Sequence, residues 1–395
     1  MANAFKLEEL EGKLALLTFD VPGKPVNTFS QPVLTELEEI VTKLEGRKDL
    51  KGLLLKSAKP GQYIAGADLN ELGMLAYATK NDVQKGLERG HQLFTRVSKL
   101  PFPTVALIDG NCMGGGTELS LSMDYRIASN SPSTKIGLPE VKVGLVPGWG
   151  GTQRLPRVVG VHHSIEMITS GEPASAAKAA AIGLVFDAVP AENLVEEGRR
   201  LVEFAHESGE WTENRKLREQ PLGLSEDQFR FAFGVSEGAV LGQTKGQYPA
   251  PVAALRAIRD GINVTLAEGL EIEKKYAAEV TGSQISANLI GVFFMTNQLA
   301  RDRGVTDPNV KARPVKRVGV LGAGQMGAGI ATAHARSGIP AGIVDVDDAR
   351  LADGMKRAAD TVAGRMKIGR ATPQDMQTLL SNLSTSTSHS LFSEC

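Results

Sequence analysis

Apolar residues occur along the chain in two patterns, short continuous runs and helical spacing. Leu14–Phe19 and Gly52–Lys56 are short, largely apolar runs, which predict buried strands. Between them, Pro32–Leu44 places its apolar residues three or four positions apart, which predicts a helix with Ser30 as its N-cap. A strand, a helix and a second strand in this order indicate a right-handed βαβ unit and therefore an α/β fold.

Helical spacing continues in the second half of the sequence. Further helices are expected over 81–100, 159–170, 175–182, 191–204 and 252–261. Leu266–Thr296 is expected to form one long helix whose apolar residues pack against the first domain. Arg301–Arg313 is charged and breaks the helical periodicity, so a domain boundary is expected near Ala312.

Length and composition are those of an ordinary soluble protein. The 395 residues suggest two or three domains, and 42% of them are hydrophobic and 23% charged. A net charge of −1 gives no overall field that would favour nucleic acid or an anionic membrane. Cys112 and Cys395 are far apart and form no metal-ligand pattern, which favours a reducing compartment. With no secretion signal or membrane-spanning run in the sequence, a cytoplasmic protein is expected.

The residues that can carry chemistry gather between positions 101 and 156. A predicted strand, Thr104–Ile108, leads through three glycines, Gly114–Gly116, into a helix that carries Glu118. Glycine lets a ligand approach the free N–H groups at a helix start, where the helix dipole favours the negative oxygen of an enolate. A Gly-Leu-Pro-Glu segment then presents a second carboxylate, Glu140. Two carboxylates beside backbone donors suit proton transfer next to a carbonyl group.

Spacing alone leaves a structural interpretation open. Glu118 could simply complement the helix dipole, and Glu140 could be a solvated surface charge. The stretch as a whole, however, resembles the crotonase (enoyl-CoA hydratase/isomerase) family. The resemblance is carried by Ile64–Leu69, Gly110, Gly114–Gly116, Glu118, Asp124–Ala128, Gly137–Glu140, Gly144–Gly148, Gly150–Thr152, Arg154–Pro156 and Ala181–Val189, the last with a departure at Phe186.

The resemblance implies a crotonase-type ββα spiral core with a helical C-terminal linker. It implies that the substrate is a coenzyme A thioester whose carbonyl oxygen is held by the backbone N–H groups of Ala67 and Gly115. Glu118 and Glu140 would position a water and add it to a 2-enoyl-CoA, giving 3-hydroxyacyl-CoA without a cofactor. By analogy Glu118 is the base and Glu140 the acid, although the two roles could be reversed. Isomerisation of a 3-enoyl to a 2-enoyl double bond is also expected of such a site.

Three further positions are implied at the substrate. Asp68 follows the oxyanion donor and fixes its loop or touches substrate. Trp149 is expected in the wall of the acyl pocket. Asn297, near the end of the linker helix, aligns with a position that contacts the acyl-CoA in relatives.

A second motif begins at Arg317. A predicted strand enters a Gly-x-Gly-x-x-Gly turn, and a helix and a second strand ending at Asp345 follow, as a dinucleotide site requires. The expected cofactor-binding residues are Gly322, Gly324, Met326, Gly327 and Asp345. The carboxylate of Asp345 would accept from the adenosine ribose and repel a 2′-phosphate, which favours NAD over NADP. A turn that persists only as a structural remnant is the alternative.

This segment resembles the start of a 3-hydroxyacyl-CoA dehydrogenase domain. With the preceding helix, it implies the N-terminal part of a multifunctional fatty-acid oxidation complex α-subunit, whose parent would use NAD. The expected domains are a crotonase core over 1–190, a helical extension and linker over 191–312, and a truncated Rossmann domain over 313–395. After Asp345 no further strand and no catalytic His–Glu pair is expected, because the tail is rich in Ser and Thr. Dehydrogenase activity is therefore expected to be lost.

The resemblance also suggests partners and alternatives. A thiolase β-subunit and a homo- or hetero-oligomer are expected. One alternative is another crotonase-fold enzyme, an acyl-CoA isomerase or thioester hydrolase. The other is a fragment that docks a thiolase without catalysis.

Overall fold

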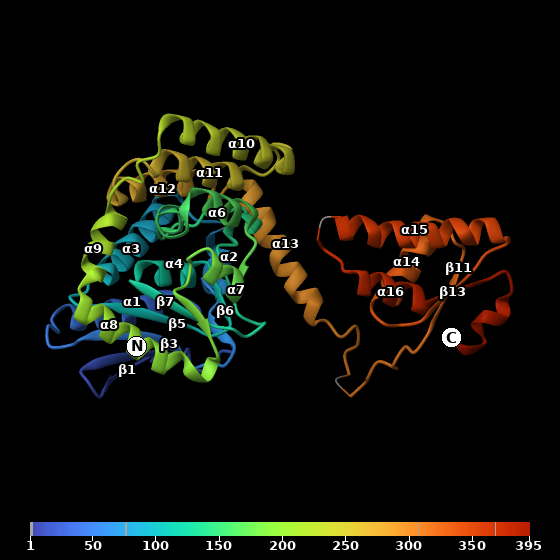
Figure 1. Cartoon of the computed structure of the whole chain (residues 1–395), viewed down its shortest axis with the longest axis horizontal. Coiled ribbons are helices and arrows are strands. Elements are labelled where there is room, and N and C mark those ends of the chain that lie inside the picture. The colour runs from blue at the N-terminus through green and yellow to red at the C-terminus, as the bar shows by residue number, and fades with distance from the viewer. Residues whose placement is uncertain (1–2, 76, 308, 368) are drawn as a thin grey trace. The chain divides into compact units, whose positions relative to one another are not determined.

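The computed structural model describes residues 3–75, 77–307, 309–367 and 369–395. The chain forms two compact units, Met1–Arg301 and Asp302–Cys395 (Figure 1). In the described part of the chain, no helix is long and apolar enough to cross a membrane.

The first unit is built on a six-stranded sheet in the order β1-β2-β3-β5-β7-β10. The first two strands form an antiparallel hairpin, and every later pairing is parallel. The strands are β1 (Phe5–Leu10), β2 (Leu14–Phe19), β3 (Gly52–Ser57), β5 (Thr104–Ile108), β7 (Tyr125–Ser129) and β10 (Asp187–Val189). All five residues of β5 are buried, as its uninterrupted apolar sequence predicts for a strand covered on both faces.

A second, four-stranded sheet accompanies the first. Its strands are β4 (Gln62–Ile64), β6 (Asn111–Met113), β8 (Lys135–Gly137) and β9 (Ala174–Ser175), and the first three are parallel. β4, β6 and β8 each come next in the chain after a strand of the large sheet. The pairs β3-β4, β5-β6 and β7-β8 are therefore repeats, each followed by a helix. Because β4, β6 and β8 are parallel, the loops that leave them emerge at one edge of the small sheet.

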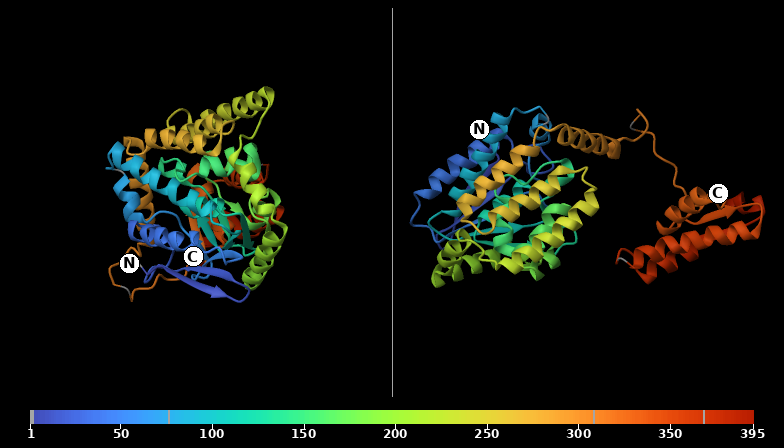
Figure 2. Two further views of the ribbon diagram at one scale, coloured as in Figure 1. Left: turned by 90° about the vertical axis from the view of Figure 1, so that its left-hand side faces the viewer. Right: turned by 90° about the horizontal axis from the view of Figure 1, so that it is seen from above.

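Helices cover both faces of the large sheet. The helices of the first unit are α1 (Gln31–Glu45), α2 (Leu69–Leu75), α3 (Lys80–Ser98), α4 (Gly115–Ser122), η1 (Glu140–Val143), α5 (Gly151–Arg154), α6 (Pro156–Ser170), α7 (Ala176–Ala181), η2 (Ala191–Asn193), α8 (Leu194–Ser208), α9 (Glu210–Glu219), α10 (Glu226–Thr244), α11 (Pro249–Gly261), α12 (Leu266–Val280) and α13 (Gln284–Arg301). Leu201 and Val202 of α8 pack on one face of the sheet, and the larger core lies on the other. Helices α10, α11 and α12 lie together at one end of the unit (Figure 1, Figure 2).

The prediction of one helix over 266–296 is wrong. The chain turns between α12 and α13, where Gly282 has a φ of +75°. That conformation favours glycine, and it ends the helical hydrogen bonding although the apolar spacing continues on both sides.

The second unit is a small three-stranded sheet with helices packed against it. Parallel strands β11 (Val318–Leu321), β12 (Ala341–Val344) and β13 (Leu383–Ser386) form a sheet in that order. Helices α14 (Gln325–Arg336), α15 (Asp348–Lys367) and α16 (Pro373–Asn382) and the short η3 (His389–Glu394) complete it. The expectation of no further strand after Asp345 is wrong, since β13 pairs with β12. Its Leu-Ser-Thr-Ser sequence gave no apolar run, and its pairing with a buried neighbour defines it.

Gly110 is expected to be needed for the junction between the large and the small sheet. It has a φ of +83°, and a Cβ there would lie 1.8 Å from the carbonyl oxygen of Gly61. Gly12 has a nearly equal φ of +82° with nothing within 4 Å of its Cβ position, so it is a matched control. We expect Gly110→Ala to lower the free energy of unfolding by about 2 kcal/mol more than Gly12→Ala, because only the first adds a clash to the backbone strain. Denaturant unfolding measures both, and equal losses would contradict the expectation.

Candidate active site

The loops that follow β4 and β6 meet at the edge of the small sheet. Gly66 has a φ of +93°, and a Cβ there would lie 3.1 Å from the carbonyl oxygen of Met113. The neighbouring Ala67 and Gly115 therefore present their N–H groups from adjacent backbones. In the described part of the chain, neither N–H donates to a protein acceptor. Gly115 is also the first residue of α4, where the helix dipole adds positive potential.

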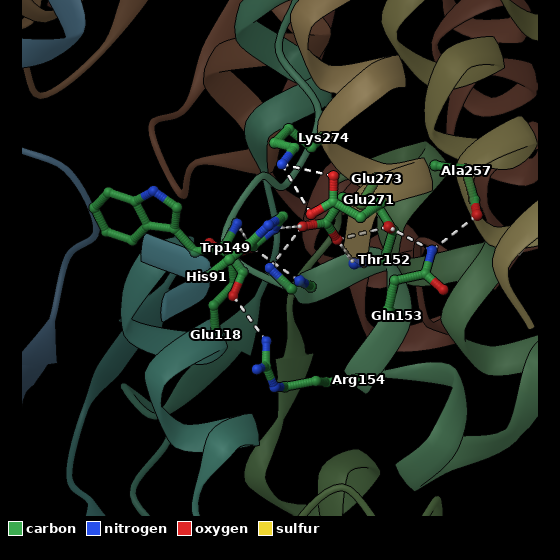
Figure 3. Close-up of polar contacts among 12 residues, drawn as sticks. His91, Glu118, Trp149, Thr152, Gln153, Arg154, Ala257, Glu271, Glu273 and Lys274 are labelled. Carbon is green, nitrogen blue, oxygen red and sulfur yellow. Dashed lines mark hydrogen bonds and ion pairs between the residues drawn. The ribbon is translucent and has the colours of Figure 1, made fainter. Parts of the chain in front are cut away.

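Glu118 lies in the first turn of α4 and is 2% exposed. Its Oε1 accepts hydrogen bonds from the N–H of Trp149 at 2.7 Å and from that of Gly151 at 2.9 Å (Figure 3). A Cβ at Gly151 would lie only 3.0 Å from this oxygen, so glycine is what admits the carboxylate. None of the hydrogen bonds among the described residues uses Oε2, which leaves that atom for a substrate or a water.

Glu140 is the first residue of η1, directly after β8. A Cβ at Gly114 would lie 2.9 Å from its Oε1, so its carboxyl group lies against the glycine turn that precedes α4. Its other oxygen, Oε2, is buried and has no hydrogen-bond partner among the described residues. The third parallel strand of the small sheet thus brings the second acid to the same edge as the two backbone donors.

Burial dominates the electrostatics of the two acids. It raises the pKa of Glu118 well above its usual value, and the charges of Glu140 and Glu273 raise that pKa further, while the two backbone N–H bonds oppose the shift. Burial, with a contribution from Glu273, raises the pKa of Glu140 to about 8. Among the described residues, no Lys or Arg forms an ion pair with either carboxyl. The two groups are therefore able to hold and exchange a proton near neutral pH.

Trp149 lies beside this pair. Its Nε1 donates to the carbonyl oxygen of Gly86 at 3.2 Å, and its ring contacts Phe94 edge-to-face with centroids 5.5 Å apart. Cβ atoms at Gly90 and Gly115 would lie 2.0 and 2.9 Å from ring atoms, so the indole fits only against glycine. The ring thus borders the backbone donor of Gly115, in agreement with a role as a pocket wall, which stays a prediction.

Asp68 and Asn297 each form hydrogen bonds with other groups of the protein. The Oδ2 of Asp68 accepts the hydroxyl of Thr28 at 3.3 Å, and its N–H donates to the carbonyl of Phe29, so the residue fixes the loop that carries Ala67. The amide of Asn297 donates to the carbonyl oxygen of Phe293 on its own helix at 3.0 Å. A contact of either side chain with substrate stays a prediction.

The glycine turn of the second unit has the geometry of a dinucleotide site. Gly322 has a φ of +92°, and a Cβ at Gly327 would lie 1.8 Å from the carbonyl oxygen of Gly322. Cβ positions at Gly322 and Gly324 have nothing within 4 Å, so the space over the start of α14 is open for a pyrophosphate. Met326 is 77% exposed beside it.

Asp345 already holds this turn in place. Its Oδ2 accepts from the N–H of Ala323 and its Oδ1 from that of Val346, both at 2.7 Å. These two bonds lower the pKa of Asp345, so it is ionised as ribose recognition requires. The residues present therefore fit NAD.

Sequence reasoning missed a buried pair behind the glutamates. His91, to which no role was assigned, contacts Glu273 of α12, with His91 Nε2 and Glu273 Oε1 2.8 Å apart. Glu273 is 0% exposed. Its sequence signal was available, because it lies between Leu270 and Ala277 on the buried face of its helix, where an acid is unusual.

Comparison with known proteins places the chain in a family. The family model described as "Enoyl-CoA hydratase/isomerase" matches residues 9–213, about half of the chain. The chain belongs to the enoyl-CoA hydratase/isomerase family. A second model, "3-hydroxyacyl-CoA dehydrogenase, NAD binding domain", matches residues 317–395, which contain the glycine turn. The predicted resemblance and the NAD-type turn are thus confirmed at the level of family.

Curated relatives of the chain carry the name "Fatty acid oxidation complex subunit alpha". That of Vibrio parahaemolyticus is 37% identical over 88% of this chain and 48% of its own length. That of Shewanella halifaxensis is 34% identical over 98% of this chain and 54% of its own length. The chain spans about half the length of the curated relatives it matches.

Two solved structures share the fold of this chain. A carnitinyl-CoA dehydratase from Mycobacterium thermoresistibile matches with a TM-score of 0.56 at 21% identity, covering 79% of this chain and 98% of its own. The human mitochondrial delta3-delta2-enoyl-CoA isomerase matches with a TM-score of 0.54 at 19% identity, covering 76% of this chain and 100% of its own. The prediction of a crotonase-type core followed by part of a Rossmann unit is correct.

The raised pKa of Glu140 predicts a pH-dependent stability. The folded protein binds this proton more tightly than the unfolded chain, so the contribution is present at low pH and is lost as the pH rises toward about 8. Glu140→Gln is always neutral and avoids the loss. We expect the stability of Glu140→Gln relative to the unmodified protein to rise by about 4 kcal/mol between about pH 5 and about pH 9. Urea unfolding at each pH measures it.

Glu39→Gln, on the exposed side of α1, is the control for this experiment. Its difference from the unmodified protein should not change with pH. If the stability difference between Glu140→Gln and the unmodified protein is equally independent of pH, the expectation of a raised pKa at Glu140 is contradicted.

Proposed function

We propose that the chain hydrates 2-enoyl-CoA thioesters to 3-hydroxyacyl-CoA, as a hydro-lyase acting in fatty-acid β-oxidation. One observation carries the proposal: among the described residues, two buried carboxyl groups without cationic partners lie beside two backbone N–H groups that have no protein acceptor. Membership of the enoyl-CoA hydratase/isomerase family supports the reaction class. The name of the relatives supports the metabolic setting.

In the proposed mechanism, the N–H groups of Ala67 and Gly115 bind the thioester oxygen. Glu118 removes a proton from a water, whose oxygen bonds to C3 while the double-bond electrons move toward the thioester oxygen. The resulting enolate returns its electrons to C2, which takes a proton from Glu140. Each backbone donor stabilises the negative oxygen by about 3 kcal/mol, as in other oxyanion holes.

The surroundings of the two acids support this division of roles. Glu118 accepts two backbone N–H bonds, which favour its ionised form and thus the base. The buried oxygen of Glu140 has no such donor among the described residues, which favours its protonated form and thus the acid. Burial nevertheless raises the pKa of both acids, so the proton belongs to the coupled pair and the assignment of base and acid follows the family resemblance.

The same pair supports isomerisation as a second activity. Shifting a 3-enoyl double bond needs one carboxyl to remove a proton from C2 and return it at C4, with the same oxyanion hole and no bound water. Comparing hydration with isomerisation in the single glutamate variants separates the two activities.

For the second unit we propose NAD binding without substrate oxidation by this chain. The open space at Gly324 and the ionised Asp345 support binding, and NAD, when bound, supplies a hydride acceptor. In the described part of this unit the histidines are His334 and His389, and neither has a glutamate partner among its contacts. The base that a hydroxyl oxidation requires is thus not built from these residues.

The longer relatives suggest a wider setting. We propose that residues 1–190 form the catalytic core, 191–312 the extension and linker, and 313–395 the dinucleotide-binding part of a two-function α-subunit. The word "complex" in the name of the relatives supports assembly into an oligomer, with a thiolase β-subunit as the proposed partner. A cytoplasmic location is proposed with it.

The activity test uses crotonyl-CoA hydration, followed as loss of absorbance of the conjugated thioester. Because each acid transfers a proton, we expect Glu118→Gln and Glu140→Gln each to lower kcat by about 10²- to 10⁴-fold, with small changes in KM. Glu271→Gln, on the outward side of α12, is the control and should leave kcat unchanged. If Glu118→Gln and Glu140→Gln both keep the kcat of the unmodified chain, the assignment of the two acids is disproved.

The nucleotide test measures NAD binding by calorimetry. Gly324 has a φ of −65° that any residue adopts, so Gly324→Val should fold while its side chain fills the space over the turn. We expect at least about a tenfold weaker affinity for NAD. Gly329→Val, elsewhere on α14 and equally uncrowded, should bind NAD normally. Equal affinities in the two variants would rule out this turn as the site.

A further inference from the structure

Two buried carboxylates hold opposite sides of the backbone from Trp149 to Thr152. The N–H groups of Trp149 and Gly151 donate to Glu118, at 2.7 and 2.9 Å. The N–H groups of Gly150 and Thr152 donate to Glu273, at 2.6 and 2.8 Å (Figure 3). Successive peptide groups thus alternate between an acid on α4 and an acid on α12.

The acceptor sites of Glu273 are fully used within the protein. Its Oε1 accepts from Gly150 N–H and lies 2.8 Å from His91 Nε2, and its Oε2 accepts from the N–H and the hydroxyl of Thr152. A carboxylate offers about four acceptor sites, and four donors fill them.

His91 connects this acid to α3. A carboxylate only accepts, so Nε2 carries the hydrogen of their contact, while Nδ1 is buried without a partner among the described residues. Gly90, directly before it, lies against the Trp149 ring. Lys274, next to Glu273, forms ion pairs with Glu88 and Glu271 instead, so the imidazole is the side chain of α3 that orients Glu273.

We propose that Glu273, oriented by His91, is a positioning residue that aims the N–H groups of Trp149 and Gly151 at the catalytic Glu118. The inference rests on the proposed function and deepens it. Two of these four N–H groups point to Glu118, and the alternating ones of Gly150 and Thr152 need acceptors on the other side. Glu273 supplies those acceptors, and thereby fixes Glu118 with its second oxygen toward the substrate.

The charge of Glu273 also acts on the catalytic pair. It raises the pKa of Glu118 and that of Glu140. Around Glu273 lie His91 on α3 and Arg154 on α5, with the two catalytic acids on α4 and η1 and Glu271 and Lys274 on its own helix. Removing the negative charge leaves these other groups in place, so the pKa values of the catalytic pair should fall.

The test compares two glutamines in the full-length chain. Glu273→Gln places an NH2 group against backbone donors and removes the charge. We expect kcat for crotonyl-CoA hydration to fall on the order of 10²-fold with KM changed by less than about threefold, because a misplaced acid affects the chemical step. The pH profile of kcat should shift toward lower pH.

Glu36→Gln is the matched control. Glu36 is also a buried acid that accepts two backbone N–H bonds, from Ala4 and Phe5 at 3.0 Å each, but it lies on α1 away from the catalytic pair. Glu36→Gln should lower the stability of the protein and leave both kcat and the pH profile of kcat unchanged. If both variants lose stability and keep the same kcat and profile, the inference is overturned.

A second pair keeps the inference testable if Glu273→Gln does not fold. His91→Ala removes the donor to Glu273, and His91→Gln restores an N–H at this position. We expect a lower kcat in the first and partial recovery in the second, both at unchanged KM. Equal kcat in His91→Ala and the unmodified chain would overturn the inference, whereas an unmodified chain without hydratase activity would overturn the proposed function itself.

Discussion

Parallel pairing of three very short strands is the constraint on which the rest of the site depends. β4, β6 and β8 are three residues each and too short to be stable alone, yet each continues directly from a long buried strand of the large sheet. The pairing brings three loops to one edge, with the donors of Ala67 and Gly115 on two of them and Glu140 on the third. Ala67 and Gly115 are 48 residues apart in sequence, and Gly115 and Glu140 are 25 apart, so each loop adds one of these groups.

The glycines at this edge leave space that larger side chains would fill. Gly114 leaves room for Glu140, Gly151 for Glu118, and Gly115 for the Trp149 ring. The result is a site in which each of the two carboxyl groups and the indole lies directly against the backbone of a glycine. Backbone partners move little, so the geometry is set before substrate arrives, and the acids are desolvated without a counter-ion. The unfavourable burial of the two acids is the main source of their raised pKa values, and it would suit them to the proposed proton transfer.

Much of the fold could be predicted from the sequence, but one helix break, one strand and one buried acid could not. The central strands, the start of α4, the two glutamates and the glycine turn at Gly322 could be predicted because each depends on a local pattern. The break at Gly282 was missed because apolar spacing continues across it, and β13 because a Ser/Thr strand is defined by its neighbour. Glu273 was missed for a different reason. Its partners, His91 and Thr152, are 182 and 121 residues away, and only the tertiary fold brings them together.

The long-range pair explains why the helical extension belongs to the catalytic unit. The match to the family model ends at residue 213, and Glu273 lies beyond it on α12. Through the backbone of Gly150 and Thr152 it nevertheless constrains the segment that binds Glu118. A core that ended before α12 would keep both glutamates and both oxyanion donors and would leave two buried N–H groups without acceptors. Unpaired buried donors are costly, so that segment would rearrange toward other acceptors, and the alignment of Glu118 would be lost with it.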